Sequence, residues 1–272
     1  MIQFGICNEI FKDWTLDDTF AYAAKVGYDA VEIAPFTIAK HVTDISAAQR
    51  QQIKDAAARH KIAISGIHWV LVQTEGLHLT HPDPAVRART SAYFGELAKF
   101  CADIGGKTIV VGSPKQRNIL ENVSAQQAWD FATEVFREPV MRAEQHGVTI
   151  CFEPLAPSET NFVNTAACAI QFVEQLHTPH FKIILDVKAM SSEAKTIPDI
   201  IRESWPHFAY FHANDKNLKG PGFGEVDFLP IAAALKEVGY QGCVSVEVFN
   251  FDEGPEVIAT QSLACLRKVF GK

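Results

Sequence analysis

The segments KVGYDAVEI (25–33), DIGGKTIVV (103–111), QHGVTICFE (145–153) and EVGYQGCVSVE (237–247) repeat one pattern. Each begins with the end of an amphipathic stretch, continues through one or two glycines and includes a short apolar run. A glycine at this point is a typical helix stop, and the apolar run favours a strand that is buried on both faces. Helices that alternate with such strands predict a parallel sheet.

The same alternation continues through the whole chain. Strands are expected over 2–7, 29–33, 62–68, 107–112, 148–153, 182–186, 208–213 and 243–247. Helices are expected over 16–26, 46–60, 84–104, 124–146, 228–238 and 255–270. Ser46 and Ser124 are the expected N-caps of two of these helices, because a serine oxygen accepts a hydrogen bond from the first free backbone amides.

Eight strands without an intervening linker favour a closed (β/α)₈ TIM barrel that forms a single α/β domain, 1–272. Such a barrel typically needs ~250 residues, and the chain has 272. The alternative is an open doubly wound sheet, which would normally carry a glycine-rich phosphate loop after an early strand. No such loop follows 2–7. The long loops 70–83, 113–123 and 214–226 all follow strands, so a barrel would place them on its carboxyl-end rim.

Composition and charge limit the classes of function. The formal net charge is −7 and no long basic run appears, which argues against a nucleic-acid partner. The first residues do not read as a secretory signal, and no apolar run of ~18 residues predicts a membrane span. The six cysteines form no CxxC pair, which is typical of buried, reduced thiols in a cytoplasmic protein.

Four consecutive strands each deliver one metal-competent side chain at the carboxyl end: Glu153, Asp186, His212 and Glu247. A single acidic residue at a strand end is more often a helix cap or an ion-pair partner. Three carboxylates that converge on one rim would repel each other, and one bound dication would remove the repulsion. Because the set holds oxygen and imidazole ligands without a thiolate, Mn²⁺ is favoured, with Mg²⁺, Co²⁺ or Zn²⁺ as alternatives.

Five segments carry a resemblance to a known family: GSPKQRN (112–118), CFEPLAPSETNFVNT (151–165), IILDVKAM (183–190), YFHANDKNLKGPGFGEVDF (210–228) and VSVEVF (244–249). Together they resemble the xylose isomerase-like barrel superfamily. They are most similar to its sugar phosphate isomerase/epimerase branch, which includes the ketose 3-epimerases related to D-tagatose and D-psicose epimerase. The resemblance covers essentially the whole chain.

The resemblance implies roles for particular residues. The four strand-end residues would be the metal ligands, and Glu153 and Glu247 would also be the two acid/base glutamates. Glu159 matches a glutamate that supports the first catalytic glutamate and the substrate. Two positions depart from the epimerase pattern: Ala189 stands where the family has a substrate-contacting histidine, and the loop 214–226 contains no arginine. The metal site therefore transfers to this chain, whereas the exact substrate does not.

The expected chemistry is metal-assisted proton transfer next to a carbonyl, through an enediolate. One glutamate would remove the proton and the other would return it to the opposite face, as in a sugar epimerase. Return of the proton to the neighbouring carbon would make the same site an aldose–ketose isomerase. Loss of a β-hydroxyl would make it a lyase, such as an inosose, 3-keto-sugar or 3-dehydroshikimate dehydratase. The expected enzyme class is an isomerase of carbohydrate metabolism, with the lyase as the alternative.

Further candidate contacts for the substrate are His68, Trp69, Glu32, Lys115, Arg117 and Lys219. His68 and Glu32 would end strands, and Trp69 would form an apolar wall for the sugar. Lys115 and Arg117 could hold a phosphate or carboxylate of the substrate, and Lys219 could replace the missing arginine. The alternative for each is structural: a hydrogen-bonded histidine or glutamate, or a solvated loop.

Two other functions share this barrel. An AP endonuclease-like DNA repair enzyme would need more histidines on the rim than this chain supplies, and the negative net charge opposes it. A non-catalytic sugar-binding protein would not need both Glu153 and Glu247. The expected partner is a small-molecule sugar or keto-polyol, and the family resemblance adds a homo-oligomer, a dimer or tetramer, as an expectation.

Overall fold

The computed structural model describes residues 1–271, and Lys272, the last residue of the predicted domain, lies outside them. Eight parallel strands close into a barrel in chain order, which confirms the predicted TIM barrel. Pairing of Gln3 with Cys243 joins the first strand to the last and so closes the barrel. The strands are β1 (Gln3–Cys7), β2 (Ala30–Ile33), β3 (Ala63–Ile67), β4 (Thr108–Val111), β5 (Thr149–Phe152), β6 (Phe181–Asp186), β7 (Phe208–Ala213) and β8 (Cys243–Val246).

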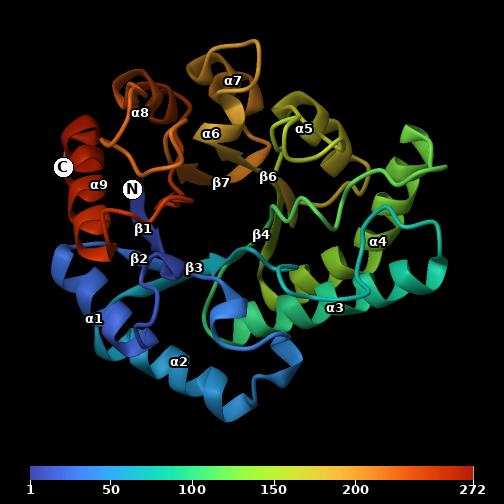
Figure 1. Ribbon diagram of the computed structural model, residues 1–272, viewed down its shortest axis with the longest axis horizontal. Coiled ribbons are helices and arrows are strands. Elements are labelled where there is room, and N and C mark those ends of the chain that lie inside the picture. The colour runs from blue at the N-terminus through green and yellow to red at the C-terminus, as the bar shows by residue number, and fades with distance from the viewer. Residues whose placement is uncertain (272) are drawn as a thin grey trace.

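Helices surround the strands in chain order, and the last helix lies next to the first (Figure 1). The α-helices are α1 (Leu16–Val26), α2 (Ala47–Arg59), α3 (Pro84–Asp103), α4 (Ala125–His146), α5 (Ala166–Glu174), α6 (Val187–Met190), α7 (Ile197–Ser204), α8 (Phe228–Glu237) and α9 (Pro255–Phe270). Three short 3₁₀ helices follow β1 and β2: η1 (Asn8–Ile10), η2 (Pro35–Thr37) and η3 (Val42–Asp44).

The predicted helix ends agree with the caps in the structure. Ser46 and Ser124 each accept a hydrogen bond from the backbone three residues on, and a glutamine side chain returns the bond to complete a capping box. Gly27 and Gly147 end α1 and α4 in the left-handed region, with φ of 105° and 65°. A residue with a Cβ would be strained there, which is why glycine marked these ends in the sequence.

Three helices, α5, α6 and α7, were not identified from the sequence. They have nine, four and eight residues, so each offers little of the helical period by which longer helices are recognised. The shortest, α6, begins directly after β6 because the Asp186 side chain accepts a hydrogen bond from the Ala189 amide at 2.7 Å. The strand-end aspartate is therefore a helix cap as well as a candidate metal ligand.

Two apolar clusters fix the positions of the strand ends. Inside the barrel a small cluster fills the interior with Ala30, Val110, Cys151, Ile184, Tyr210 and Cys243. Outside it, the β5 residue Phe152 packs against Phe172 of α5, with ring centroids 4.8 Å apart, and Phe136 of α4 packs on Phe181 of β6 at 4.9 Å. Strands packed on both faces hold the residues that follow them in fixed positions.

Within residues 1–271, none of the helices combines the length and the apolar character needed to cross a membrane. All six cysteines are free thiols; four of them are buried, as the sequence predicted, whereas Cys168 and Cys265 are half-buried.

Candidate metal centre and active site

Four side chains from consecutive strand ends meet at one point of the rim. Glu153 and Glu247 lie one residue beyond β5 and β8, Asp186 ends β6, and His212 lies within β7. Each offers a nitrogen or oxygen that lies within 4.8 Å of those of the other three. All four residues are buried, with 0–6% of their surface exposed. The structure thus brings together the four residues that the sequence predicted as a ligand set.

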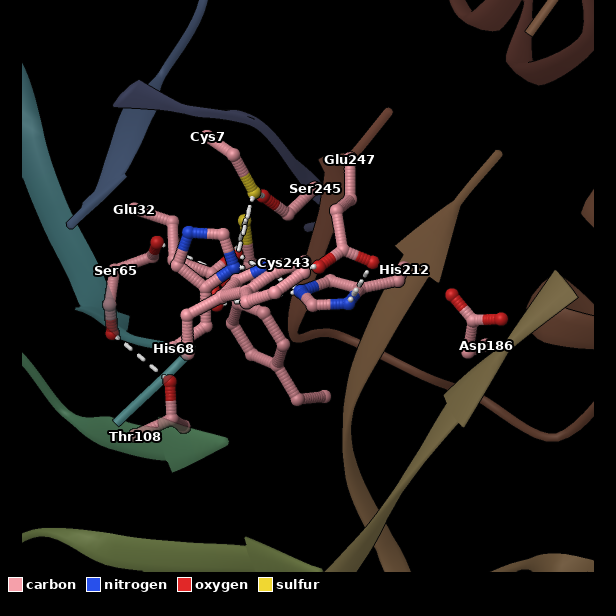
Figure 2. Close-up of polar contacts among 12 residues, drawn as sticks. Cys7, Glu32, Ser65, His68, Thr108, Asp186, His212, Cys243, Ser245 and Glu247 are labelled. Atoms are coloured by element: carbon pink, nitrogen blue, oxygen red, sulfur yellow. Dashed lines mark hydrogen bonds and ion pairs between the residues drawn. The ribbon is translucent and has the colours of Figure 1, made fainter. Parts of the chain in front are cut away.

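The imidazole of His212 lies between two carboxylates. Its Nε2 is 3.0 Å from Glu32, and its Nδ1 is 3.1 Å from Glu247 Oε2 (Figure 2). Because the ionised Glu32 can only accept, Nε2 carries a proton, and Nδ1 would offer its lone pair to a cation that displaces the second proton of the imidazole. His212 Nδ1 and Glu247 Oε2 are buried without a hydrogen-bond partner among residues 1–271. Two such orphaned acceptors that face each other fit a bound cation.

Asp186 faces this pair from β6, as Figure 2 shows, and both of its oxygens are held. Oδ1 accepts from the Ala189 amide at 2.7 Å, and Oδ2 accepts from the side-chain amide of Asn214 at 2.5 Å. Neutral donors of this kind orient a carboxylate without neutralising its charge, so Asp186 stays available to a cation.

Burial and mutual repulsion shift the protonation of two carboxylates. Burial, and then the charges of Asp186 and Glu247, raises the pKa of Glu153 to about 8. Burial, and then the charge of Glu247, raises the pKa of Asp186 to about 6. These shifts express the electrostatic cost of crowding three carboxylates in a buried site, and a bound dication would offset that cost.

Glu247 behaves differently because histidines surround it. Burial alone would raise its pKa, but the positive charges of His212 and His68, together with a hydrogen bond to His68, hold the pKa of Glu247 well below its ordinary range. The indole Nε1 of Trp69 also donates to Glu247 Oε1 at 3.0 Å. His68 in turn lies between Glu247, at 3.4 Å, and Glu9, at 2.9 Å. Burial opposes ionisation of His68, yet Glu9 and Glu32 raise its pKa to about 10.

A small cavity of about 100 Å³ opens over the two glutamates, and it is lined by His68, Trp69, Val110, Gly112, Pro114, Glu153, Leu155, Glu159, Lys188, Glu247 and Phe249. Lys188 is the lysine among these residues. Its Nζ donates to Glu159 at 2.7 Å and lies 4.0 Å from the centre of the Phe249 ring. The predicted substrate contacts His68, Trp69 and Glu159 therefore do line the cavity beside the candidate ligands.

Gly112, the first residue after β4, lies directly beneath Glu153. A Cβ at this position would collide with Glu153 Oε2. The glycine thus leaves the space that the Glu153 carboxylate occupies in the cavity, and a side chain here would displace it.

Two predicted substrate contacts lie elsewhere. Glu32 was expected on the rim, but it is fully buried inside the barrel, where Tyr210 donates to it at 3.0 Å and His212 at 3.0 Å. Burial opposes its ionisation, yet the charges of His212 and His68 hold its pKa at about 2. The predicted position of Glu32 on the rim is therefore wrong: inside the barrel, its carboxylate accepts a hydrogen bond from His212.

Arg117 was expected to reach a phosphate or carboxylate of the substrate. Instead it is fully buried, and its guanidinium donates to the main-chain carbonyls of Glu153, at 2.5 Å, and of Val111. It also stacks 4.3 Å from the centre of the Phe152 ring. The cation is thereby satisfied by the backbone of β4 and β5, so the predicted substrate contact is replaced by a structural one.

The two predicted lysine contacts also lie apart from the cavity. Lys115 is exposed on the loop after β4. Lys219, on the loop after β7, forms an ion pair with Glu253. A lysine already paired in this way offers no free charge in place of the arginine that the epimerase pattern has.

Sequence reasoning missed two contributors to the site, Asn214 and Glu9, and for Lys188 it left open whether the side chain enters the site or pairs with its neighbours. Lys188 and Asn214 each lie two residues beyond a candidate ligand, so their place in the chain was a usable signal. Glu9 lies after β1, outside the four strands that drew attention, and its polar character alone did not distinguish it.

Residues 20–269 match a family model described as Xylose isomerase-like TIM barrel. The chain belongs to this family. Its membership confirms the resemblance that the five sequence segments indicated.

Relatives of this chain include sugar epimerases. The D-psicose 3-epimerase of Ruminiclostridium cellulolyticum is 29% identical over 245 residues, which are 88% of this chain and 80% of that protein. The 3-dehydro-D-guloside 4-epimerase of Escherichia coli is 23% identical over 273 residues, 98% of this chain and 99% of that protein. A crystal structure of a D-psicose 3-epimerase in the presence of D-fructose superposes with a TM-score of 0.86 over 100% of both chains at 24% identity, which shows the shared fold.

Proposed function

We propose that this protein is a divalent-metal-dependent sugar epimerase that transfers a proton next to a carbonyl. One observation carries the proposal: Glu153 and Glu247 line one small cavity and belong to a four-residue ligand set with Asp186 and His212. The epimerase names of the family relatives support the same reaction class.

The two glutamates suit opposite halves of one proton transfer. Glu153 and Glu247 follow strands β5 and β8, which lie on different sides of the barrel, and both face the same cavity. One carboxylate removes the proton of the C–H beside the carbonyl, and the other returns a proton to the opposite face of the planar intermediate. The result is inversion at that carbon, with no net gain or loss of atoms.

Lys188 and Glu159 supply the polar contacts that would orient the sugar. They are paired at 2.7 Å in the cavity wall, and Glu159 keeps a buried oxygen without a partner among residues 1–271. An unpaired carboxylate oxygen is an acceptor for a sugar hydroxyl, and the ammonium is a donor to an oxygen that gains negative charge.

The ligand set fits one dication, with Mn²⁺ as our preferred ion. Three carboxylates and one imidazole suit a hard or borderline metal, and the orphaned His212 Nδ1 and Glu247 Oε2 supply acceptors for it. When bound, such an ion polarises the substrate carbonyl and makes the adjacent C–H more acidic.

The test is proton exchange in D₂O. Wild-type protein, freed of metal with a chelator and then loaded with Mn²⁺, is incubated with D-fructose, D-psicose, D-tagatose and methyl 3-keto-glucoside. Deuterium is expected at the carbon beside the carbonyl together with an epimer, and chelated protein should give neither. Aldose formation would identify an isomerase, and an enone product would identify a lyase.

The variants Glu153→Gln and Glu247→Gln separate the two faces. If each glutamate serves one face, Glu153→Gln keeps exchange from one epimer and Glu247→Gln keeps it from the other, provided that metal analysis shows Mn²⁺ in both. Glu121→Gln, an exposed change on the loop after β4, is the matched control. Absence of exchange with every sugar at saturating Mn²⁺ would overturn the proposal and leave a sugar-binding barrel.

The proposal includes a cytoplasmic enzyme that assembles into a dimer or tetramer. Sedimentation of the purified protein measures the assembly state, and fractionation of cells measures the location.

A further inference from the structure

An apolar groove of about 830 Å³ opens on the rim beside the catalytic cavity. The loops after β1, β2, β3 and β8 form its walls, and its aromatic lining is Phe11, Trp14, Phe36, Trp69, Phe249 and Phe251. Ring centroids lie 5.4 Å apart for Phe11 and Trp14, and 6.3 Å apart for Phe36 and Trp69. A concave, largely apolar space of this size is typical of a small-molecule site.

The groove and the catalytic cavity share a wall. Trp69 and Phe249 line both spaces, and their ring centroids are 6.0 Å apart. On the catalytic side, Trp69 donates a hydrogen bond to Glu247, and the ring of Phe249 contacts the ammonium group of Lys188. A molecule bound at Glu247 therefore lies next to the groove, with the rings of Trp69 and Phe249 between the two spaces.

The catalytic cavity alone is small. Its volume of about 100 Å³ is below the range of about 300–1,000 Å³ that holds a typical ligand, whereas the groove lies within that range. The chemistry and the larger part of the binding surface thus occupy adjacent but separate spaces.

Glu9 places an unsatisfied acceptor at the edge of the groove. It lines the groove, its side chain is 8% exposed, and Oε2 bonds His68 of the catalytic cavity. Its other oxygen, Oε1, is buried without a hydrogen-bond partner among residues 1–271. A buried acceptor at this border is suited to a hydroxyl of a ligand that spans both spaces.

We propose that the substrate is a keto-sugar glycoside with an apolar, aromatic aglycone. The keto-sugar ring enters the catalytic cavity and the aglycone stacks in the groove. Aromatic rings pack well against a flat apolar group, and the groove offers six of them. This inference rests on the proposed function and names its substrate class.

The glycosidic bond fixes where the carbonyl must be. A glycoside cannot open to a free ketose, because its anomeric carbon is substituted. Proton abstraction needs a C–H next to a carbonyl, so the carbonyl must be an oxidised ring carbon. The step then removes a proton from the adjacent ring carbon and returns one to its opposite face, and the glycosidic bond stays intact.

Relative turnover tests the inference. The probes are phenyl 3-keto-glucoside, methyl 3-keto-glucoside and D-fructose, with Mn²⁺-loaded wild-type protein. The expected kcat/KM for the phenyl glycoside exceeds that for the methyl glycoside by about tenfold or more. In Phe36→Ala and Phe251→Ala this preference should fall toward one, mainly through KM, whereas Leu229→Ala on α8, distant in the chain and exposed, should keep it.

Calorimetry with unreactive phenyl and methyl glucoside adds a readout that is independent of the reaction. The phenyl compound should bind wild-type protein more tightly, and Phe251→Ala should remove the difference.

The possible failures are distinct. If no sugar exchanges deuterium, the proposed function fails, whereas the calorimetric preference still tests the groove. If both glycosides react and bind equally well, the function stands and the groove inference is overturned. It is also overturned if Phe251→Asp converts an oligomer into monomers while the phenyl preference is unchanged, because a second copy of the chain then covers the groove.

Discussion

The charged side chains of the rim lie at the ends of β5 to β8, whereas the aromatic side chains of the groove lie mostly on the loops after β1, β2 and β8. The two regions meet at Trp69, which lines both spaces and donates to Glu247. Residues at strand ends are held by the packed barrel, while loops tolerate change. The difference indicates that residues at strand ends carry out the reaction, whereas loop residues determine which substrate binds.

The largest expected effect comes from the charged side chains at the ends of β5 to β8, which we call the charged region. In Asp186→Asn we expect Mn²⁺ affinity to fall at least about 100-fold and epimerisation to be lost, because one of three anionic oxygen donors becomes a neutral amide. Calorimetric titration with Mn²⁺ and deuterium exchange measure the two effects. Asp252→Asn, an exposed change on the loop after β8, is the control. Unchanged Mn²⁺ binding in Asp186→Asn would show that Asp186 serves only as the cap of α6.

The second prediction compares the carboxylates that support the two histidines. Glu32 supports His212 in the charged region, and Glu9 supports His68 at the groove. Glu32→Gln should lower Mn²⁺ affinity about 10–100-fold, because a neutral partner no longer strengthens His212 as a ligand. Glu9→Gln should leave Mn²⁺ affinity nearly unchanged.

Titration of both variants with Mn²⁺, followed by activity at high Mn²⁺, separates this role from a structural one. Excess metal should restore activity to Glu32→Gln. Equal losses of affinity in the two variants would remove the distinction between the regions.

The charged region could be read from the sequence because each of its residues ends or closely follows an apolar strand. A polar residue at such a position stands out from the hydrophobic residues around it, and the barrel brings the ends of consecutive strands together. The closed barrel, the helix caps at Ser46 and Ser124, and the convergence of Glu153 and Glu247 followed from local patterns of this kind.

The direction in which a side chain points could not be inferred from the sequence in the same way. Glu32 lies near the end of β2 and Arg117 lies on the loop after β4, yet Glu32 faces the barrel interior and Arg117 turns back to main-chain carbonyls. The pairing register between β2 and β3 shifts between Val31 and Glu32, and no local sequence pattern predicts this shift. The groove was missed for a related reason: apart from Trp69, its aromatic residues are scattered over loops, where no period marks them.

The third prediction concerns Lys188, whose contact with Phe249 lies at the border of the two regions. Lys188→Met should lower kcat/KM about tenfold, because Glu159 loses its partner and leaves an uncompensated charge in the cavity. Lys188→Arg should recover part of the loss, since a cation returns. Separate kcat and KM values for several sugars make the measurement, and Lys195→Met, an exposed lysine, is the control. If Lys188→Arg and Lys188→Met are equally impaired, shape rather than charge determines the role of Lys188.

The smallest expected effect lies in the long loop after β3, which begins with Trp69 and continues to His78 and beyond. Leu79 of the β3 loop bonds Gln116 of the β4 loop, and next to it His78 Nδ1 accepts from the Thr80 amide at 3.2 Å. Burial, and then the charge of His81, lowers the pKa of His78 to about 4, below the ordinary value of about 6.5. The folded protein therefore binds this proton less well than the unfolded chain, and the stability it contributes above pH ~6.5 is lost as the pH falls toward 4.

His78→Asn keeps an acceptor for the Thr80 amide and removes the titration. Wild-type protein should lose about 2–4 °C more in Tm than this variant when the pH falls from 7 to 5, as thermal unfolding at each pH measures. His177→Asn, which changes an exposed histidine, controls for the loss of one imidazole. An equal pH dependence in wild type and His78→Asn would mean that protonated His78 is accommodated in the fold. The loop around His78 would then be more open to water than its buried contacts indicate.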